Sequence, residues 1–155
     1  MNLWNIKTMS VKVQRTIEAT PFEVFDAWLD PDCKGSPWNG VTKLILQPVE
    51  DGLFLRTHAA NGGDYELAHY GRFTVLERPR RMQYTWVSQH TRGLESLVTI
   101  TFEERKGATQ VTLVHENLPD DEKGRMHEQG WQYYLAKAAE VLTTATAANP
   151  QRRST

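Results

Sequence analysis

The side chains with the greatest potential for chemistry in this sequence are its five histidines, at positions 58, 69, 90, 115 and 127. Their spacing forms neither H-x-x-x-H nor H-E-x-x-H, so the pattern does not predict a zinc site. The single cysteine, Cys33, excludes an intrachain disulfide and a thiolate metal cluster. The sequence also lacks G-x-S-x-G, a phosphate loop and a dinucleotide fingerprint. We therefore predict no metal ligands, no cofactor and no catalytic residue.

His115 is the histidine whose place in the pattern is most informative. In the predicted strand from 109 to 117 it continues the apolar phase of Val111 and Leu113, so its side chain is expected to point inward. Three roles fit that position. It can be a core-edge histidine bonded to a carbonyl or a tryptophan, a polar anchor in a pocket, or a catalytic acid or base.

Large aromatic side chains form the second group of interest. They can simply fill a core, or they can line a cavity with an apolar body and a few polar points. Arg56 and His58 lie in one phase of a predicted strand and would make such a cavity partly polar. The candidate ligand-binding residues are therefore Trp28, Trp38, Arg56, His58, Trp86, His115, Trp131 and Tyr134.

A long helix must position two of these residues, Trp131 and Tyr134. The segment from Asp120 to about Thr146 places apolar and aromatic residues at three- and four-residue steps. Acidic residues stand at its start, and Asn149-Pro150 follows its end. About 24 residues make a rod of roughly 36 Å, which needs a broad partner. The predicted inward stripe is His127, Trp131, Tyr134, Leu135, Ala138, Leu142 and Ala145.

The preceding chain reads as a sheet that could supply that partner. A half-buried strand over 10–18 leads into a helix over 21–29, where Thr20, Pro21 and Glu23 form a capping box. A second short helix is expected over 31–34. Short turns between the later strands imply antiparallel neighbours. The six later strands are predicted at 41–49, 53–58, 65–77, 82–89, 95–104 and 109–117.

Length and charge bound the remaining possibilities. The 155 residues suit one domain, and the net charge of −1 gives no electrostatic reason to bind nucleic acid. We expect a loose leader over 1–9, with Met1 or Met9 as the start, a domain over 10–147 and a tail over 148–155. The lone cysteine and the absence of a long apolar run predict a cytoplasmic protein without membrane insertion. Either a monomer or a homodimer fits.

The order of motifs resembles the START-like helix-grip superfamily, also called SRPBCC, and within it the branch of homologues of the activator of the heat-shock protein 90 ATPase. The resemblance covers about residues 11–143. It implies an α+β fold in which a seven-stranded curved antiparallel sheet wraps around a long C-terminal helix, with two short helices after the first strand. The motifs that carry it include Arg15-Thr16-Ile17, the Val24–Trp28 run, Asp30-Pro31, Tyr70-Gly71-Arg72-Phe73, Tyr84, Trp86, His115 and Gly130-Trp131.

The resemblance leaves three functions open. The first is a protein that binds a small hydrophobic or aromatic ligand between sheet and helix, without catalytic residues. The second is a polyketide cyclase-like enzyme, in which His115 would act with Arg56, His58 or Tyr134. The third is a chaperone-interacting stress protein. We rank it lowest, because the better-known co-chaperones of this kind carry an additional N-terminal domain.

Overall fold

One antiparallel sheet of seven strands forms the body of the protein, in the order β1-β7-β6-β5-β4-β3-β2. The structure is a computed structural model that describes residues 5–148. The predicted first residues of the leader, the tail from 149 onward and the side chain of Ala145 lie outside what it describes. The strands are β1 (Thr8–Ile17), β2 (Lys43–Leu46), β3 (Leu53–Ala60), β4 (Tyr65–Glu77), β5 (Arg81–Ser88), β6 (Ser96–Arg105) and β7 (Ala108–Pro119).

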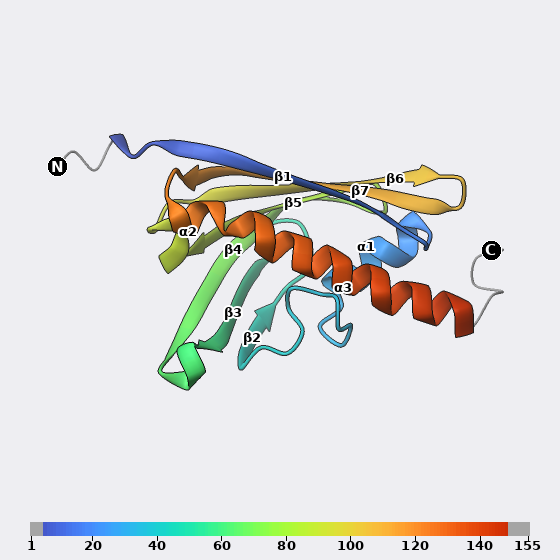
Figure 1. Cartoon of the computed structure of the whole chain (residues 1–155), viewed down its shortest axis with the longest axis horizontal. Helices are drawn as coiled ribbons and strands as arrows, with labels where there is room; N and C mark the ends of the chain where they lie inside the picture. The colour runs from blue at the N-terminus through green and yellow to red at the C-terminus, as the bar shows by residue number, and fades with distance from the viewer. Residues whose placement is uncertain (1–4, 149–155) are drawn as a thin grey trace.

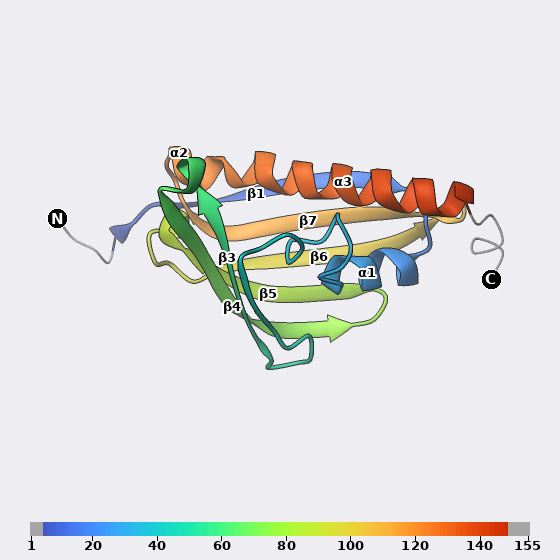
Figure 2. The same ribbon diagram turned by 90° about the horizontal axis from the view of Figure 1, so that it is seen from below.

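The long helix α3 (His127–Ala148) lies across the concave face of this sheet, alongside β1 (Figure 1). Figure 2 shows β5, β6 and β7 running beneath the helix, while β3 and the first part of β4 rise steeply at one end. The predicted curved sheet around a C-terminal helix is confirmed. The inward stripe is confirmed at Trp131, Leu135, Ala138 and Leu142, which are all buried.

The start of the long helix differs from the prediction. A separate short helix, α2 (Glu122–Arg125), precedes α3, and Asp121 caps it by accepting a hydrogen bond from the Gly124 amide at 2.8 Å. Met126 separates the two helices. The single rod expected from Asp120 is therefore two helices, of which Asp121 caps the first.

The first helix, α1 (Pro21–Leu29), has the predicted capping box, in which the Thr20 side chain and Glu23 bond reciprocally. The predicted second helix over 31–34 is wrong. This part of the chain forms successive turns, with amide-to-carbonyl bonds from Cys33 to Asp30 and from Ser36 to Cys33. The Ser36 hydroxyl also donates to the Trp28 carbonyl. These turns carry Trp38 into the core, where it is 1% exposed.

The strand predictions are close for most of the sheet. β4 has the predicted bounds, and β1 begins at Thr8, so the last two residues of the predicted leader are part of the sheet. β2 is shorter than the predicted 41–49. The Gln47 amide still donates to the Leu53 carbonyl, but beyond it the chain bonds to itself, since the Val49 amide donates to the Gln47 carbonyl.

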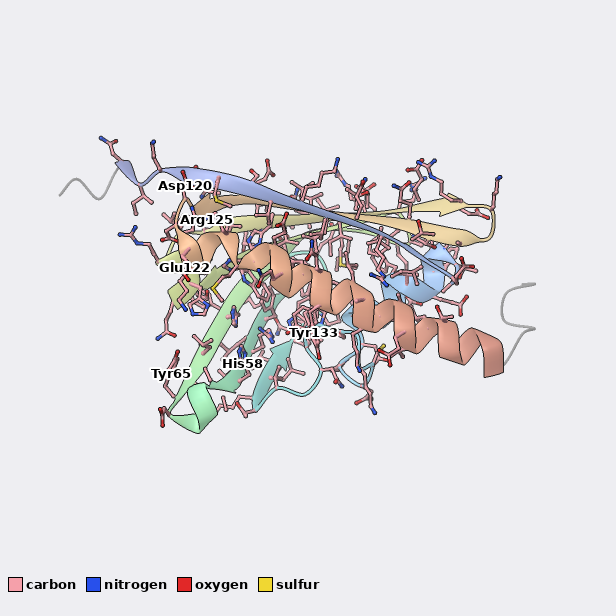
Figure 3. The ribbon with its side chains drawn as sticks, in the orientation of Figure 1. His58, Tyr65, Asp120, Glu122, Arg125 and Tyr133 are labelled. Carbon is pink, nitrogen blue, oxygen red and sulfur yellow. The ribbon has the colours of Figure 1, made fainter. Side chains whose placement is uncertain are left out.

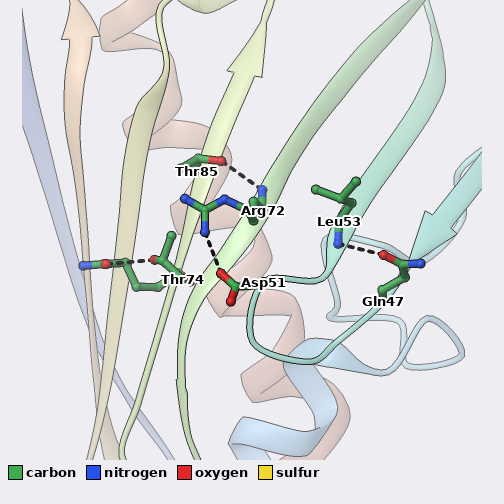
Figure 4. Close-up of polar contacts among 7 residues, drawn as sticks. Gln47, Asp51, Leu53, Arg72, Thr74 and Thr85 are labelled. Carbon is green, nitrogen blue, oxygen red and sulfur yellow. Dashed lines mark hydrogen bonds and ion pairs between the residues drawn. The ribbon is translucent and has the colours of Figure 1, made fainter.

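Polar contacts on the outer side of the sheet tie the β3–β4 hairpin to the β2–β3 turn and to β5 (Figure 4). Arg72 pairs with Asp51 at 2.8 Å, and its amide donates to the Thr85 hydroxyl. Gln47 accepts a bond from the amide of Leu53 at the start of β3. This hairpin carries Arg56 and His69 on its inner side, so the contacts hold the strands that position the candidate site.

Candidate functional site

A cavity of about 190 Å³ opens between β3, β4, β5 and the first turns of α3. Aromatic rings form much of its wall, and the remaining side chains are mostly basic. Among the residues that the structure describes, no aspartate or glutamate lines it. In Figure 3, His58 on β3 lies beside the first half of α3. The lining residues are Arg56, His58, His69, Trp86, His90, Lys123, Met126, His127, Gly130, Trp131 and Tyr134.

The sheet register brings the polar groups together. Arg56 and His58 are two residues apart on β3, so their side chains point to the same face of the sheet. Arg56 also lies directly across the ladder from His69 on β4. The His69 ring packs on Trp86 of β5 with 4.8 Å between centroids. His58 stacks on His69 at 5.4 Å. Three adjacent strands thus contribute one continuous surface.

Arg56 is the central polar group of this surface. It is 4% exposed, and its guanidinium donates to His69 Nδ1 at 3.0 Å and to the Tyr134 hydroxyl at 2.9 Å. It also lies 5.6 Å from the Trp86 ring. Because an arginine can only donate, His69 Nδ1 accepts, and a neutral His69 carries its proton on Nε2. Burial lowers the pKa of Arg56 from its ordinary value.

Burial also sets the charge of the surrounding histidines. It lowers the pKa of His69 to about 2, with Arg56 and His58 adding to the effect. The pKa values of His58, His90 and His127 are lowered, again mainly by burial. His127 Nδ1 donates to backbone carbonyls of α2, which opposes that shift. These rings are therefore neutral at pH 7, and they are poor general acids there.

His115 belongs to a separate network. Trp131 Nε1 donates to His115 Nδ1 at 2.9 Å, so a neutral His115 donates from Nε2 to the Ser96 hydroxyl at 2.7 Å. Ser96 in turn donates to the Trp86 carbonyl. Burial lowers the pKa of His115 well below its ordinary value. Both ring nitrogens have partners, so the network is a structural tie between β5, β6, β7 and α3.

The structure separates the predicted site residues into two groups. Arg56, His58, Trp86, Trp131 and Tyr134 line the cavity. Trp28, Trp38 and His115 do not, although they lie in the same interior. Whether any of the eight contacts a ligand remains a prediction.

The buried pair Trp28 and Trp38 packs behind the cavity. Trp28 Nε1 donates to the Tyr84 hydroxyl at 3.2 Å, and both tryptophans are 1% exposed. Trp38 lies in edge contact with Phe54 and Tyr84, each with 5.4 Å between centroids. These rings pack on one another and leave no opening to solvent. Composition alone could not separate them from the tryptophans of the cavity.

Sequence reasoning missed several lining residues, namely His69, His90, Lys123, Met126, His127 and Gly130. Two signals existed. His127 was on the predicted inward stripe, and His69 shares the inward phase of Phe73 on β4. Gly130 is exposed, and an added Cβ there would meet nothing within 4 Å. Its missing side chain leaves the cavity mouth open.

Neither a metal site nor the other hollow offers a better candidate. Within the described part of the chain, no three His, Cys, Asp or Glu side chains are grouped to hold a metal ion. A second hollow of about 570 Å³ lies between α1 and β4. Its Asp26 and Arg78 bond to each other at 2.7 Å and are about half exposed. Those charges are already paired and hydrated, so they provide little specificity for a ligand.

The fold and the inner cavity define the class of protein as START-like helix-grip. Within that class, the chain belongs to the family described as "Activator of Hsp90 ATPase homolog 1-like protein", whose sequence profile matches residues 18–143. No curated protein matches the chain. In the part of the chain that the structure describes, no helix has the length and apolar character needed to cross a membrane.

Solved structures share this fold at low sequence identity. Protein CV1439 from Chromobacterium violaceum has a TM-score of 0.73 and 23% identity, over 85% of this chain and 96% of that one. The AHSA1-like protein from Aeromonas hydrophila has a TM-score of 0.67 and 25% identity, over 88% and 94%. SA2116 from Staphylococcus aureus, a protein of unknown function, has a TM-score of 0.76 and 15% identity, over 93% and 99%.

Proposed function

We propose that this protein binds a small aromatic molecule in the cavity between β3–β5 and α3. The observation that carries the proposal is the cavity itself, walled by Trp86, Trp131 and Tyr134 within an otherwise packed interior. Sites for small molecules are typically concave and apolar, with a few placed polar groups. At about 190 Å³ the space is small, since pockets for drug-sized molecules start near ~300 Å³. The ligand is therefore a compact one.

A panel of one-ring and two-ring aromatic compounds tests this function by thermal shift and by tryptophan fluorescence. Trp86 and Trp131 lie in the cavity wall, so binding changes their emission directly. A ligand present at about 100 times its Kd stabilises the folded protein by about 2.7 kcal/mol. One-ring compounds are expected to bind and larger ones to fail.

A blocking variant separates binding in this cavity from binding elsewhere. Gly130→Phe places a ring at the cavity mouth and should abolish the response. Gln129→Phe introduces the same ring at a neighbouring exposed position of α3 that does not line the cavity. This control should leave the response intact. If both variants bind like the parent protein, or if no compound binds, the proposal is wrong.

A second candidate function is an enzyme of the polyketide cyclase kind. It is favoured by one observation, the convergence of Arg56, His69 and Tyr134 in one cavity. Such a site could hold a carbonyl compound and polarise it through Arg56. Its signature would be faster exchange with deuterium of the hydrogens on the carbon next to the carbonyl of a bound ketone, which NMR can monitor. Exchange at the uncatalysed rate would eliminate this candidate.

A further inference from the structure

Arg56 is a buried cation without a counter-ion. Its two hydrogen-bond acceptors, His69 Nδ1 and the Tyr134 hydroxyl, are both neutral groups. None of the ion pairs found among the described residues includes it. A charge removed from water is costly unless an opposite charge or strong hydrogen bonds compensate for it. The folded protein therefore maintains an unpaired positive charge at the wall of an open cavity.

The rest of the lining does not neutralise that charge. Of the other titratable groups, Lys123 is basic and the histidines are held neutral by burial. The carboxylate of Asp121, near His127, caps α2 and lies 4.0 Å from Arg92. The cavity thus combines a positive potential with aromatic walls, and an anion entering it would meet no opposing acidic side chain in the lining.

Unpartnered donors point to the same kind of guest. Among the described residues, three side chains of the cavity lining have a buried nitrogen without a hydrogen-bond partner, namely Arg56 Nε, Trp86 Nε1 and His58 Nδ1. Trp38 Nε1, in the packed part of the interior, also lacks a partner. The arginine and tryptophan nitrogens can only donate. Buried donors without acceptors are rare in folded proteins, and each one needs an explanation. An acceptor-rich ligand group would supply what the protein lacks at this surface.

The size of the cavity limits what carries that group. An apolar cavity of about 150 Å³ is enough for benzene. The present cavity of about 190 Å³ therefore has room for one ring and a small substituent. Trp86 and Trp131 meet at 5.0 Å between ring centroids and form a corner against which a flat ring can pack. A carboxylate is a small planar anion whose two oxygens match the donors of a guanidinium.

We propose that the ligand is a one-ring aromatic carboxylate, with its ring against Trp86 and Trp131 and its carboxylate paired with Arg56. This inference rests on the proposed ligand-binding function and specifies the ligand class. The carboxylate pairs with the guanidinium of Arg56, whose two terminal nitrogens also donate to His69 and Tyr134. His69 and Tyr134 are positioning residues in this arrangement.

Three probes test the inference on the full chain by calorimetry and fluorescence at pH 7. Benzoate has both ring and charge, benzamide has the same shape without the charge, and acetate has the charge without the ring. We expect benzoate to bind at least tenfold more tightly than either of the others. If benzamide binds as well as benzoate, the charge assignment is wrong while the proposed aromatic site stands. If none of the three binds, the inference is wrong, and the panel of aromatic compounds decides separately whether the proposed aromatic site stands.

Variants of Arg56 locate the charge. Arg56→Met keeps the length of the side chain without its charge and should remove the preference for benzoate over benzamide. Arg56→Lys keeps the charge and should retain part of that preference. Arg78→Met changes an exposed arginine outside the cavity and should behave as the parent protein. Circular dichroism checks that each variant folds.

If Arg56→Met does not fold, Arg56→Lys together with the three probes still decides the question. A benzoate preference that survives unchanged in Arg56→Met would overturn the inference. Preference for benzamide in the parent protein would do the same.

Discussion

The interior between the sheet and α3 has two ends that differ in character. At one end Trp38 packs against Tyr84, Trp28 donates a hydrogen bond to the same tyrosine, and Gly35 lies so close to α3 that an added Cβ would clash with the backbone of Ala138. At the other end Gly130 faces open space and Arg56 lacks a counter-ion. One helix covers both ends, so the difference arises from the side chains beneath it.

This contrast teaches where stability and recognition reside. The packed end gains its free energy from apolar burial and close contact. The open end leaves donors unpaired and a charge uncompensated, which costs stability. Unfavourable local choices of this kind persist where a binding role requires them. We therefore expect substitutions at the packed end to change the free energy of unfolding, and those at the open end to change binding.

The largest expected effect is at Trp38. Replacing it by alanine removes a ring that is 1% exposed and touches Phe54 and Tyr84. A large-to-small change in a packed core of this kind costs about 3–5 kcal/mol of unfolding free energy. Denaturant titration measures it. Tyr133→Ala, which removes a ring that is 63% exposed on α3, serves as a control with an expected loss below about 0.5 kcal/mol.

Substitutions of Gly35 and Gly130 by alanine form a matched pair, with the next largest expected effects on stability. Gly35→Ala forces a Cβ against the backbone of α3 and should destabilise the protein by about 1–3 kcal/mol. Gly130→Ala adds a methyl group in open space on a helix and should stabilise it by about 0.5–1 kcal/mol. Thermal unfolding of both variants checks the opposite signs. Equal effects would mean that the two ends do not differ in packing.

A further effect is the loss of stability of the folded protein at acid pH. The folded protein resists protonation of His69, because its pKa is lowered from 6.5 to about 2, whereas the unfolded chain takes up the proton below pH 6.5. Unfolding therefore becomes easier as the pH falls, by about 1 kcal/mol for His69 between pH 6.5 and about 5.5. Above pH 6.5 the side chain is neutral in both states and the effect vanishes.

His69→Asn isolates this contribution. The variant keeps an oxygen that can accept from Arg56 but cannot be protonated in this range. Denaturant unfolding at the two pH values should show that it loses about 1 kcal/mol less than the parent protein. A parent protein and a variant with the same pH dependence would show that His69 is protonated in the folded state.

Local patterns in the sequence were enough for the elements and for which side of each faces inward. The alternation of β4 predicted the bounds 65–77, and Thr20 with Glu23 predicted the start of α1. The stripe of Trp131, Leu135 and Ala138 predicted the buried side of α3. These features have periods of two or about four residues and are fixed by neighbours along the chain.

The site depended on contacts that no local pattern contains. Arg56 meets His69 because of the β3–β4 register, and it meets Tyr134 because of where α3 crosses the sheet, 78 positions further along the chain. The turns after Asp30 carry Trp38 into the packed end, while Trp86, of the same residue type, lines the cavity. Alternation tells which face a side chain occupies, but its place along that face follows from long-range packing, and so only the tertiary structure decided which inward residues border open space.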